Sequence, residues 1–222
     1  MNNISEVFTA RGCTNKCKFC AVRILEPKYF INDNWKDSID LSKKHIMIHD
    51  NNLITGNYNH FVDVINYIKK HQLITSFDNG FDCRKFNKEH LENIKDIKFE
   101  RNGLRFAFDN MSEDIHIQRT IKMCLDASIP KSKLMIYVLF NFEDTFDEAM
   151  YRMEEIKKLG VRPYPQQFRP LNDIDLKNTH IGKHWDKTLL RDFRFYWMMP
   201  GIYTKMTWEK YQERGGEKFY RK

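Results

Sequence analysis

Residues 6–20 read EVFTARGCTNKCKFC, a short apolar run followed at once by three cysteines within eight residues. Three thiols are one too many for a disulfide, and one too few for a closed four-ligand zinc site or a fully ligated iron–sulfur cluster. Thiolates spaced by three and two residues can reach one metal centre from a single loop. On a cubane [4Fe–4S] cluster they leave one iron without a protein ligand. Cys13, Cys17 and Cys20 therefore predict a metal centre with an open position.

The whole sequence has the composition of a globular protein. Of 222 residues, 41% are hydrophobic and 30% charged, which is typical of one domain with a substantial core. No apolar stretch reaches the roughly 18 residues of a membrane helix, and the first twelve residues do not resemble a signal peptide. We therefore expect a cytoplasmic protein without a membrane partner, in which five cysteines serve metal or thiol chemistry and not a disulfide framework.

Short apolar runs alternate with segments of helical spacing as far as residue 170. The runs recur at roughly 30-residue intervals, the length of a strand–helix unit with a right-handed crossover. This pattern predicts an α/β fold, a partial (β/α)6 barrel of parallel strands. The expected strands are residues 6–10, 46–49, 74–77, 104–108, 134–140 and 162–168.

The fifth expected helix has the clearest local signals. Thr145 with Glu148 three residues later forms a capping box, and Gly160 suits the end of the helix. After residue 170 the repeat stops, and an aromatic helix near residues 189–197 ends at Pro200. We expect residues 1–170 to form the barrel core and residues 171–222 a short aromatic helical extension that packs on the same domain and covers its open edge.

The stretch CTNKCKFC fits the CxxxCxxC motif of the radical S-adenosylmethionine (AdoMet) enzymes, and the six strand–helix units resemble the partial barrel of that family. The resemblance covers about residues 4–170 and indicates a minimal single-domain member. It implies that Cys13, Cys17 and Cys20 hold a [4Fe–4S] cluster whose open iron binds AdoMet. Reductive cleavage of AdoMet then yields a 5′-deoxyadenosyl radical that removes a hydrogen atom from the substrate. The alternatives are a zinc site with a distant fourth ligand, such as His45 or His49, and simple redox thiols.

The resemblance also implies positions that bind AdoMet. An aromatic residue before the last cysteine, here Phe19, lies near the adenine in this family. After the second strand the family often has Gly-Gly-Glu, which receives the AdoMet amino group, whereas this chain has HDNN. Carboxylate and amide oxygens can still accept from an ammonium. Further candidates follow the fourth and fifth strands, where the alternative role is helix capping. The expected cofactor-binding residues are Phe19, Asp50, Asn51, Asn52, Asp109, Asn110, Val138 and Asn141.

Two more features bear on the substrate. Cys83 follows the third strand beside Arg84, whose charge favours a thiolate, so it is a candidate hydrogen-atom donor; its alternative role is an inert thiol. Around the sixth strand, Gln167 and Arg169 are candidates for binding substrate or the AdoMet carboxylate. Since alternate residues face opposite sides of a strand, either this pair or Gln166 reaches the interior.

The sequence leaves three substrate hypotheses. The first is a modified nucleobase or nucleotide in nucleic acid, suggested by the net charge of +7 and by a basic, aromatic tail with 11 Lys and Arg against 7 Asp and Glu in residues 171–222. The second is a small metabolite or a peptide inside the barrel. The third is a non-catalytic iron–sulfur or zinc protein that binds nucleic acid. As a radical AdoMet enzyme, a monomer or homodimer, the protein also requires an external electron donor such as flavodoxin or ferredoxin.

Overall fold

The computed structural model describes residues 3–171 and 179–220. Six parallel strands form two hydrogen-bonded sheets of three, in the orders β1-β4-β5 and β6-β7-β8. Five of them match the expected runs to within one residue at each end. The first begins and ends earlier than the expected residues 6–10, because the chain leaves the sheet after Val7 and residues 10–11 pair with Phe30–Ile31 instead. The strands are β1 (Ile4–Val7), β4 (His45–Ile48), β5 (Ile74–Phe77), β6 (Leu104–Ala107), β7 (Leu134–Phe140) and β8 (Arg162–Gln167).

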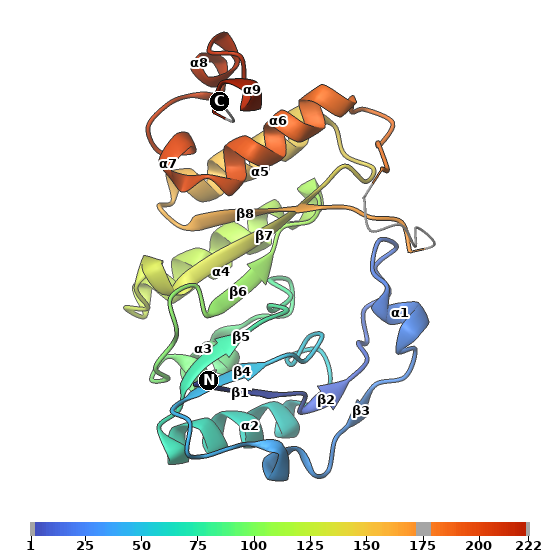
Figure 1. Cartoon of the computed structure of the whole chain (residues 1–222). Helices are drawn as coiled ribbons and strands as arrows, with labels where there is room; N and C mark the ends of the chain where they lie inside the picture. The colour runs from blue at the N-terminus through green and yellow to red at the C-terminus, as the bar shows by residue number, and fades with distance from the viewer. Residues whose placement is uncertain (1–2, 172–178, 221–222) are drawn as a thin grey trace.

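The two sheets form one curved row of strands (Figure 1), with β1 and β8 at opposite ends. Between β5 and β6 the ladder is reduced to backbone hydrogen bonds from Phe77 N to Gly103 O and from Phe81 N to Arg105 O, both 2.8 Å. The described strands do not close into a barrel. Long helices follow four of the strands, as the sequence predicts: α2 (Tyr58–His71), α3 (Lys88–Ile94), α4 (Asp114–Asp126) and α5 (Phe146–Lys158).

The first crossover differs from the expected strand–helix repeat. Between β1 and β4 the chain forms an antiparallel pair, β2 (Ala10–Arg11) with β3 (Phe30–Ile31), a four-residue helix α1 (Val22–Leu25), and a 3-10 turn η1 (Trp35–Ser38). Residues 12–20 between β2 and α1, the cysteine loop, are irregular apart from turns and bends. The cysteine loop lies where the helix of a regular strand–helix unit would begin. In place of the apolar face of such a helix, Trp35 of η1 is buried in the core.

Buried apolar side chains between the strands and α2–α5 form one core. Val64, Ile65 and Ile68 of α2 are at most 1% exposed, as an amphipathic helix over a sheet requires. In α5 the capping box is present in both directions, with Thr145 Oγ1 accepting from Glu148 N at 3.2 Å and the Glu148 side chain accepting from Thr145 N at 2.8 Å. Gly160 follows with a φ of +73°.

The tail adds helices at the β8 end of the row (Figure 1). Phe193 of α6 (Lys187–Met198) packs on Phe140 of β7 with ring centroids 4.9 Å apart. Beyond it lie α7 (Pro200–Tyr203), α8 (Trp208–Glu213) and α9 (Glu217–Tyr220), while η2 (Met111–Glu113) and η3 (Lys131–Lys133) precede α4 and β7. The expected extension thus shares the core of residues 1–170. Its residues 172–178 lie outside the described part of the chain.

The edge strand β8 contains Pro163 and Pro165. Phe168 N donates to Phe140 O at 2.9 Å, so the even-numbered amides of this segment face β7. The two prolines lie on the outward edge, where their missing N–H groups break no ladder bond.

No described helix is long and apolar enough to span a membrane.

Candidate functional site

The cysteine loop begins at a backbone position that only glycine can occupy. Gly12 has a φ of +76°, and a Cβ there would lie 2.2 Å from the carbonyl oxygen of Lys28. Glu26 accepts from Gly12 N at 2.9 Å and from Asn51 Nδ2 at 2.8 Å, and it pairs with Arg11. The start of the loop is therefore tied both to the end of α1 and to the segment after β4.

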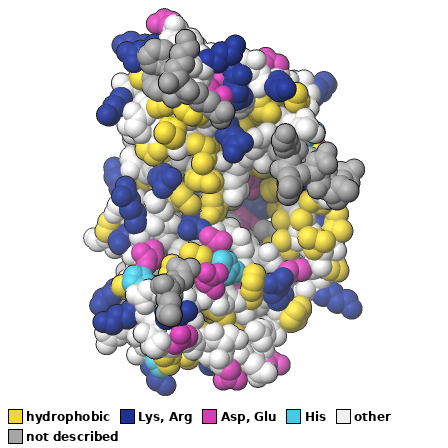
Figure 2. Space-filling model, viewed as in Figure 1, with side chains coloured by type: hydrophobic (Ala, Val, Ile, Leu, Met, Phe, Trp, Pro, Cys, Tyr) yellow, Lys and Arg dark blue, Asp and Glu magenta, His cyan; other side chains and the backbone are white. Residues whose placement is uncertain are grey.

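The three cysteines share one cavity. Cys13, Cys17 and Cys20 are free, half-buried thiols on a cavity of about 1070 Å3 at the carboxyl ends of the strands. Figure 2 shows the hollow between the α1 side of the molecule and the strands, with acidic side chains in its depth. Strand ends contribute Asp78, Asn79, Asp109, Tyr137 and Leu139 to its wall, and the tail contributes Arg194 and Met198.

The donor set fits a [4Fe–4S] cluster. No group of three or more His, Cys, Asp or Glu in the described ranges is arranged to hold a single metal ion. A cubane cluster makes a different demand, since each cysteine binds a different iron. Burial, with a smaller contribution from Asp109, raises the pKa of Cys17 to about 11, and burial also raises the pKa of Cys20. Binding of iron by these thiols would therefore release protons at neutral pH.

The segment after β4 divides into two roles. Asn51 and Asn52 line the cavity. Asn52 is 9% exposed, and its side-chain oxygen Oδ1 has no hydrogen-bond partner among the described residues. Asp50 does not line the cavity, because its carboxylate accepts from Thr9 N at 2.6 Å and from Thr9 Oγ1. Asp50 therefore links the segments that follow β1 and β4, and it does not make the expected contact with the cofactor.

The segment after β6 also contains one residue in the cavity and one cap. Asp109 lines the cavity, and burial followed by the nearby charge of Glu113 raises its pKa to about 7. Asn110 is exposed and caps η2, accepting from Ser112 N at 3.1 Å, as its alternative role predicts. Glu113 is 5% exposed and accepts from Asp109 N at 2.7 Å. Glu113 was not predicted, although an acidic residue three positions after a capping asparagine is a recognisable pattern.

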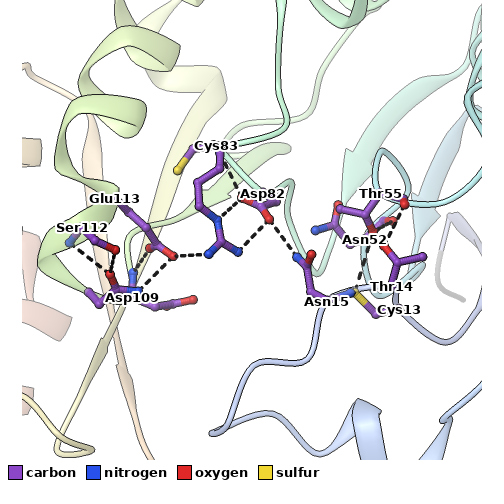
Figure 3. Close-up of polar contacts among 12 residues, drawn as sticks. Cys13, Thr14, Asn15, Asn52, Thr55, Asp82, Cys83, Asp109, Ser112 and Glu113 are labelled. Atoms are coloured by element: carbon purple, nitrogen blue, oxygen red, sulfur yellow. Dashed lines mark hydrogen bonds and ion pairs between the residues drawn. The ribbon is translucent and has the colours of Figure 1, made fainter.

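A row of polar side chains crosses the mouth of the cavity (Figure 3). Asn15 Nδ2 donates to Asp82 Oδ2 at 2.8 Å, and Arg84 donates to both oxygens of Asp82. Arg84 Nη1 also lies 3.6 Å from Glu113 Oε1. Sequence reasoning recognised DNGFDCR as a polar segment after the third strand, but it chose the cysteine of that segment and missed Asp82.

Cys83 lies in the core and not in the site. It is 1% exposed and belongs to the hydrophobic cluster, while its carbonyl oxygen accepts from Arg119 Nη2 at 2.9 Å. Burial raises the pKa of its thiol, and the charge of Arg84 offsets only part of this rise. The expected contact with a substrate radical is therefore not supported by its position.

At the end of β7 neither expected residue, Val138 or Asn141, lines the cavity. Val138 is fully buried in the core, whereas its neighbours Tyr137 and Leu139 line the cavity. Asn141 is buried and holds the tail, because its Nδ2 donates to His180 O at 3.0 Å and its Oδ1 accepts from Gly182 N at 2.7 Å. Alternation along a strand fixes such a set of neighbours, but the sequence does not indicate which parity faces the cavity.

The remaining candidates lie at the cavity. Phe19 lines it and packs edge-on against Phe142 with ring centroids 5.8 Å apart. Gln167 and Arg169 line it as well, together with Gln166. The expectation that only one parity of β8 reaches the cavity was therefore wrong, because Gln166 and Gln167 are the last two residues of the strand and both border the cavity at its carboxyl end.

Known proteins resemble this chain in structure and not in sequence. No protein-family model matches the sequence, and no curated protein matches it significantly. The structure is similar to that of SuiB from Streptococcus suis bound to precursor peptide SuiA, with a TM-score of 0.60 and 12% identity over 96% of this chain. The chain has the fold of SuiB. A second crystal structure, SuiB bound to S-adenosylmethionine, gives a TM-score of 0.53 and 13% identity over 87% of this chain.

The chain spans about half the length of SuiB, 47% in the peptide complex and 46% in the AdoMet complex. The shared fold agrees with the arrangement of strands and helices that the sequence predicts, and SuiB has been crystallised with S-adenosylmethionine. The similarity covers the α/β arrangement of parallel strands and helices.

Proposed function

We propose that this protein is a radical AdoMet enzyme that holds a [4Fe–4S] cluster through Cys13, Cys17 and Cys20. The observation that carries the proposal is the cavity itself, in which three thiols of a CxxxCxxC loop face the carboxyl ends of a parallel sheet. When bound, the cluster supplies the electron for reductive cleavage of AdoMet, and the resulting 5′-deoxyadenosyl radical removes a hydrogen atom from the substrate.

The cavity offers this chain's own groups for AdoMet. Asn52 Oδ1 is a buried acceptor without a partner in residues 3–171 and 179–220, and an ammonium donor would satisfy it. Phe19 and Leu139 supply apolar surface for the adenine, and Asp109 lies beside Cys17. A carboxyl group with a pKa of about 7 can donate as well as accept a hydrogen bond at neutral pH, which suits a ribose hydroxyl or the methionine carboxylate.

For the substrate we favour a peptide or another small polar molecule over nucleic acid. The cavity wall carries both signs of charge, with Asp78 and Asp82 as well as Arg169 and Arg194. SuiB, which shares the fold, has been crystallised with its precursor peptide. Three tail aromatics that could stack on bases, Trp185, Tyr196 and Trp197, are at most 7% exposed, because they pack in the core.

The electron must come from outside the chain. Lys16 and Lys18 are exposed on either side of Cys17, so the surface outside the cysteine loop is basic. We propose that an acidic one-electron donor, such as flavodoxin or ferredoxin, approaches here, because opposite charges steer such encounters.

The test is production of 5′-deoxyadenosine by cluster-loaded protein with AdoMet and a strong reductant. We expect the product from the wild type and none from Cys17→Ala, which should also lose the cluster absorbance. Reconstitution to four irons per chain without any 5′-deoxyadenosine would contradict the proposal. Titration with RNA, DNA and peptides at increasing salt then separates the substrate classes, because only phosphate contacts give a steep loss of affinity.

A further inference from the structure

One side chain between the first two cysteines reaches across the cavity mouth. Asn15 Nδ2 donates to Asp82 Oδ2 at 2.8 Å, joining the cysteine loop to the segment after β5, 67 residues further along the chain. Asp82 is 7% exposed, whereas Asn15 is half-buried. The acceptor is therefore fixed in the body of the molecule, and the donor belongs to a loop without regular structure.

Arg84 fixes the orientation of the Asp82 carboxylate. Its Nε donates to Asp82 Oδ1 and its Nη2 to Oδ2, both at 2.8 Å, and Arg84 N donates to Oδ1 at 3.0 Å. Such a two-point arginine–carboxylate contact sets the plane of the carboxylate as well as its position. With this edge occupied, the remaining acceptor position on Oδ2 is directed at Asn15.

The other contacts of this part of the loop are few. Thr14 Oγ1 donates to Thr55 O at 2.8 Å, and Asn15 N donates to Cys13 Sγ at 3.4 Å. Lys16 is exposed. Asn15 is thus the side chain between Cys13 and Cys17 that ties the loop to a buried charged group.

We propose that Asn15, Asp82 and Arg84 form a clamp that holds the cysteine loop in the conformation that retains the cluster. The inference rests on the proposed function, because it takes the cluster to be bound by these cysteines. All three act through the loop and are positioning residues. Arg84 extends the clamp through Glu113 to the end of β6, where Asp109 N donates to Glu113 (Figure 3).

The experiment compares Asn15→Ala, Asn15→Asp and Asp82→Asn with Asn93→Ala. Asn93 is a half-buried amide on α3 that donates to Tyr58 Oη and Glu89 O, so its variant also loses side-chain hydrogen bonds, neither of which reaches the cysteine loop. The first measurement is amide hydrogen exchange of residues 12–20 in cluster-free protein. The second is the rate at which reconstituted protein loses iron to a chelator.

We expect both rates to rise about tenfold in Asn15→Ala, which corresponds to about 1.4 kcal/mol, as for loss of a hydrogen bond to a charged group. Asn15→Asp keeps the size of the side chain but places two carboxylates together, so its rates should rise at least as far. Asp82→Asn keeps the shape of Asp82 and weakens its hold on Arg84. Asn93→Ala should match the wild type.

Wild-type exchange rates in both Asn15 variants would overturn the clamp. If the wild type itself takes up no cluster, the proposed function fails, while the exchange measurement on cluster-free protein still decides whether the clamp exists. A wild type that takes up the cluster and cleaves AdoMet, with Asn15 variants equal to it in both rates, keeps the proposed function and removes the clamp.

Discussion

At the scale of single residues, the side-chain oxygen of Asn52 is the atom that most directly indicates a ligand in the cavity. A buried acceptor without a donor costs about 1–3 kcal/mol, and Asn52 Oδ1 is in this position on the wall of the cavity. Its neighbour Asn51 lines the same wall but donates to Glu26 at 2.8 Å. One amide therefore stabilises the ligand-free fold, and the other is available for a ligand.

This difference gives a paired prediction. Asn52→Ala should leave the melting temperature of the ligand-free protein unchanged or slightly raised, because no hydrogen bond of the side-chain oxygen is lost, and should weaken AdoMet binding about tenfold. Asn51→Ala should lower the melting temperature, because the bond to Glu26 is lost. Thermal unfolding and titration calorimetry with AdoMet check both. A large loss of stability in Asn52→Ala would assign Asn52 a structural role instead.

Two buried histidines make stability depend on pH. Burial lowers the pKa of His60 and of His90, so the folded state binds fewer protons than the unfolded state below pH ~6.5. Stability is therefore complete above this value and falls as the pH drops through it. We expect the wild type to lose up to about 1.4 kcal/mol per pH unit for each histidine in this range.

His90→Phe should reduce this acid destabilisation. His90 packs between Phe61 and Phe86, with ring centroids 5.1 and 5.9 Å away, so a phenyl ring suits the site. It forfeits the contact of His90 Nδ1 with Asn87 Oδ1, 2.7 Å, and should lower stability at neutral pH slightly. Urea unfolding of cluster-free protein on both sides of pH ~6.5 measures the effect. An identical pH slope in variant and wild type would be inconsistent with this assignment.

At the scale of elements, the tail helix α6 acts as a covering layer of the sheet. Phe193 is fully buried and packs on Phe140 and Trp185, with centroids 4.9 and 5.3 Å away, while the next residue, Arg194, is exposed. Phe193→Ala should cost about 3–5 kcal/mol of folding free energy, and Arg194→Ala less than about 0.5 kcal/mol. Chemical denaturation of the two variants measures this difference. Equal stabilities would mean that residues beyond 178 are not part of the core.

The elements also show where sequence reasoning succeeds. Runs such as 134–140, apolar throughout and spaced at regular intervals, correspond to strands covered on both faces. The capping box at Thr145 is a local interaction and was predicted in full. The first crossover was mispredicted because its spacing matches a strand–helix unit, while the chain uses it for the cysteine loop and the short pair β2–β3.

The site was predictable only in part for a related reason. The cysteines are specified by spacing within one loop, and they do meet at the cavity. Val138 and Cys83 depend on which face of an element points inward, and Asp50 on a partner, Thr9, that lies 41 residues away. Asp82 and Arg84 become recognisable only when the fold brings Asn15 to them.

At the scale of the whole molecule, the net charge of +7 gives general attraction to polyanions, while Trp185, Tyr196 and Trp197 of the described tail are buried and cannot stack on bases. We expect weak binding to RNA and DNA at low salt, and no saturable binding near 0.2 M salt. Fluorescence anisotropy with labelled oligonucleotides across a salt series measures this. Tight binding that persists at 0.2 M salt would instead favour a base or nucleotide as the substrate.

The prolines of β8 affect how this molecule meets other chains. An exposed strand edge normally recruits a further strand by main-chain pairing, but Pro163 and Pro165 leave the outward side of β8 without two of its donors. Because neither proline donates an N–H, a strand added beside β8 would leave two of its acceptors unpaired, which disfavours pairing at this edge. Pro163 and Pro165 also oppose aggregation, because a strand edge with all its N–H donors can pair with the edges of other chains and extend into a fibre.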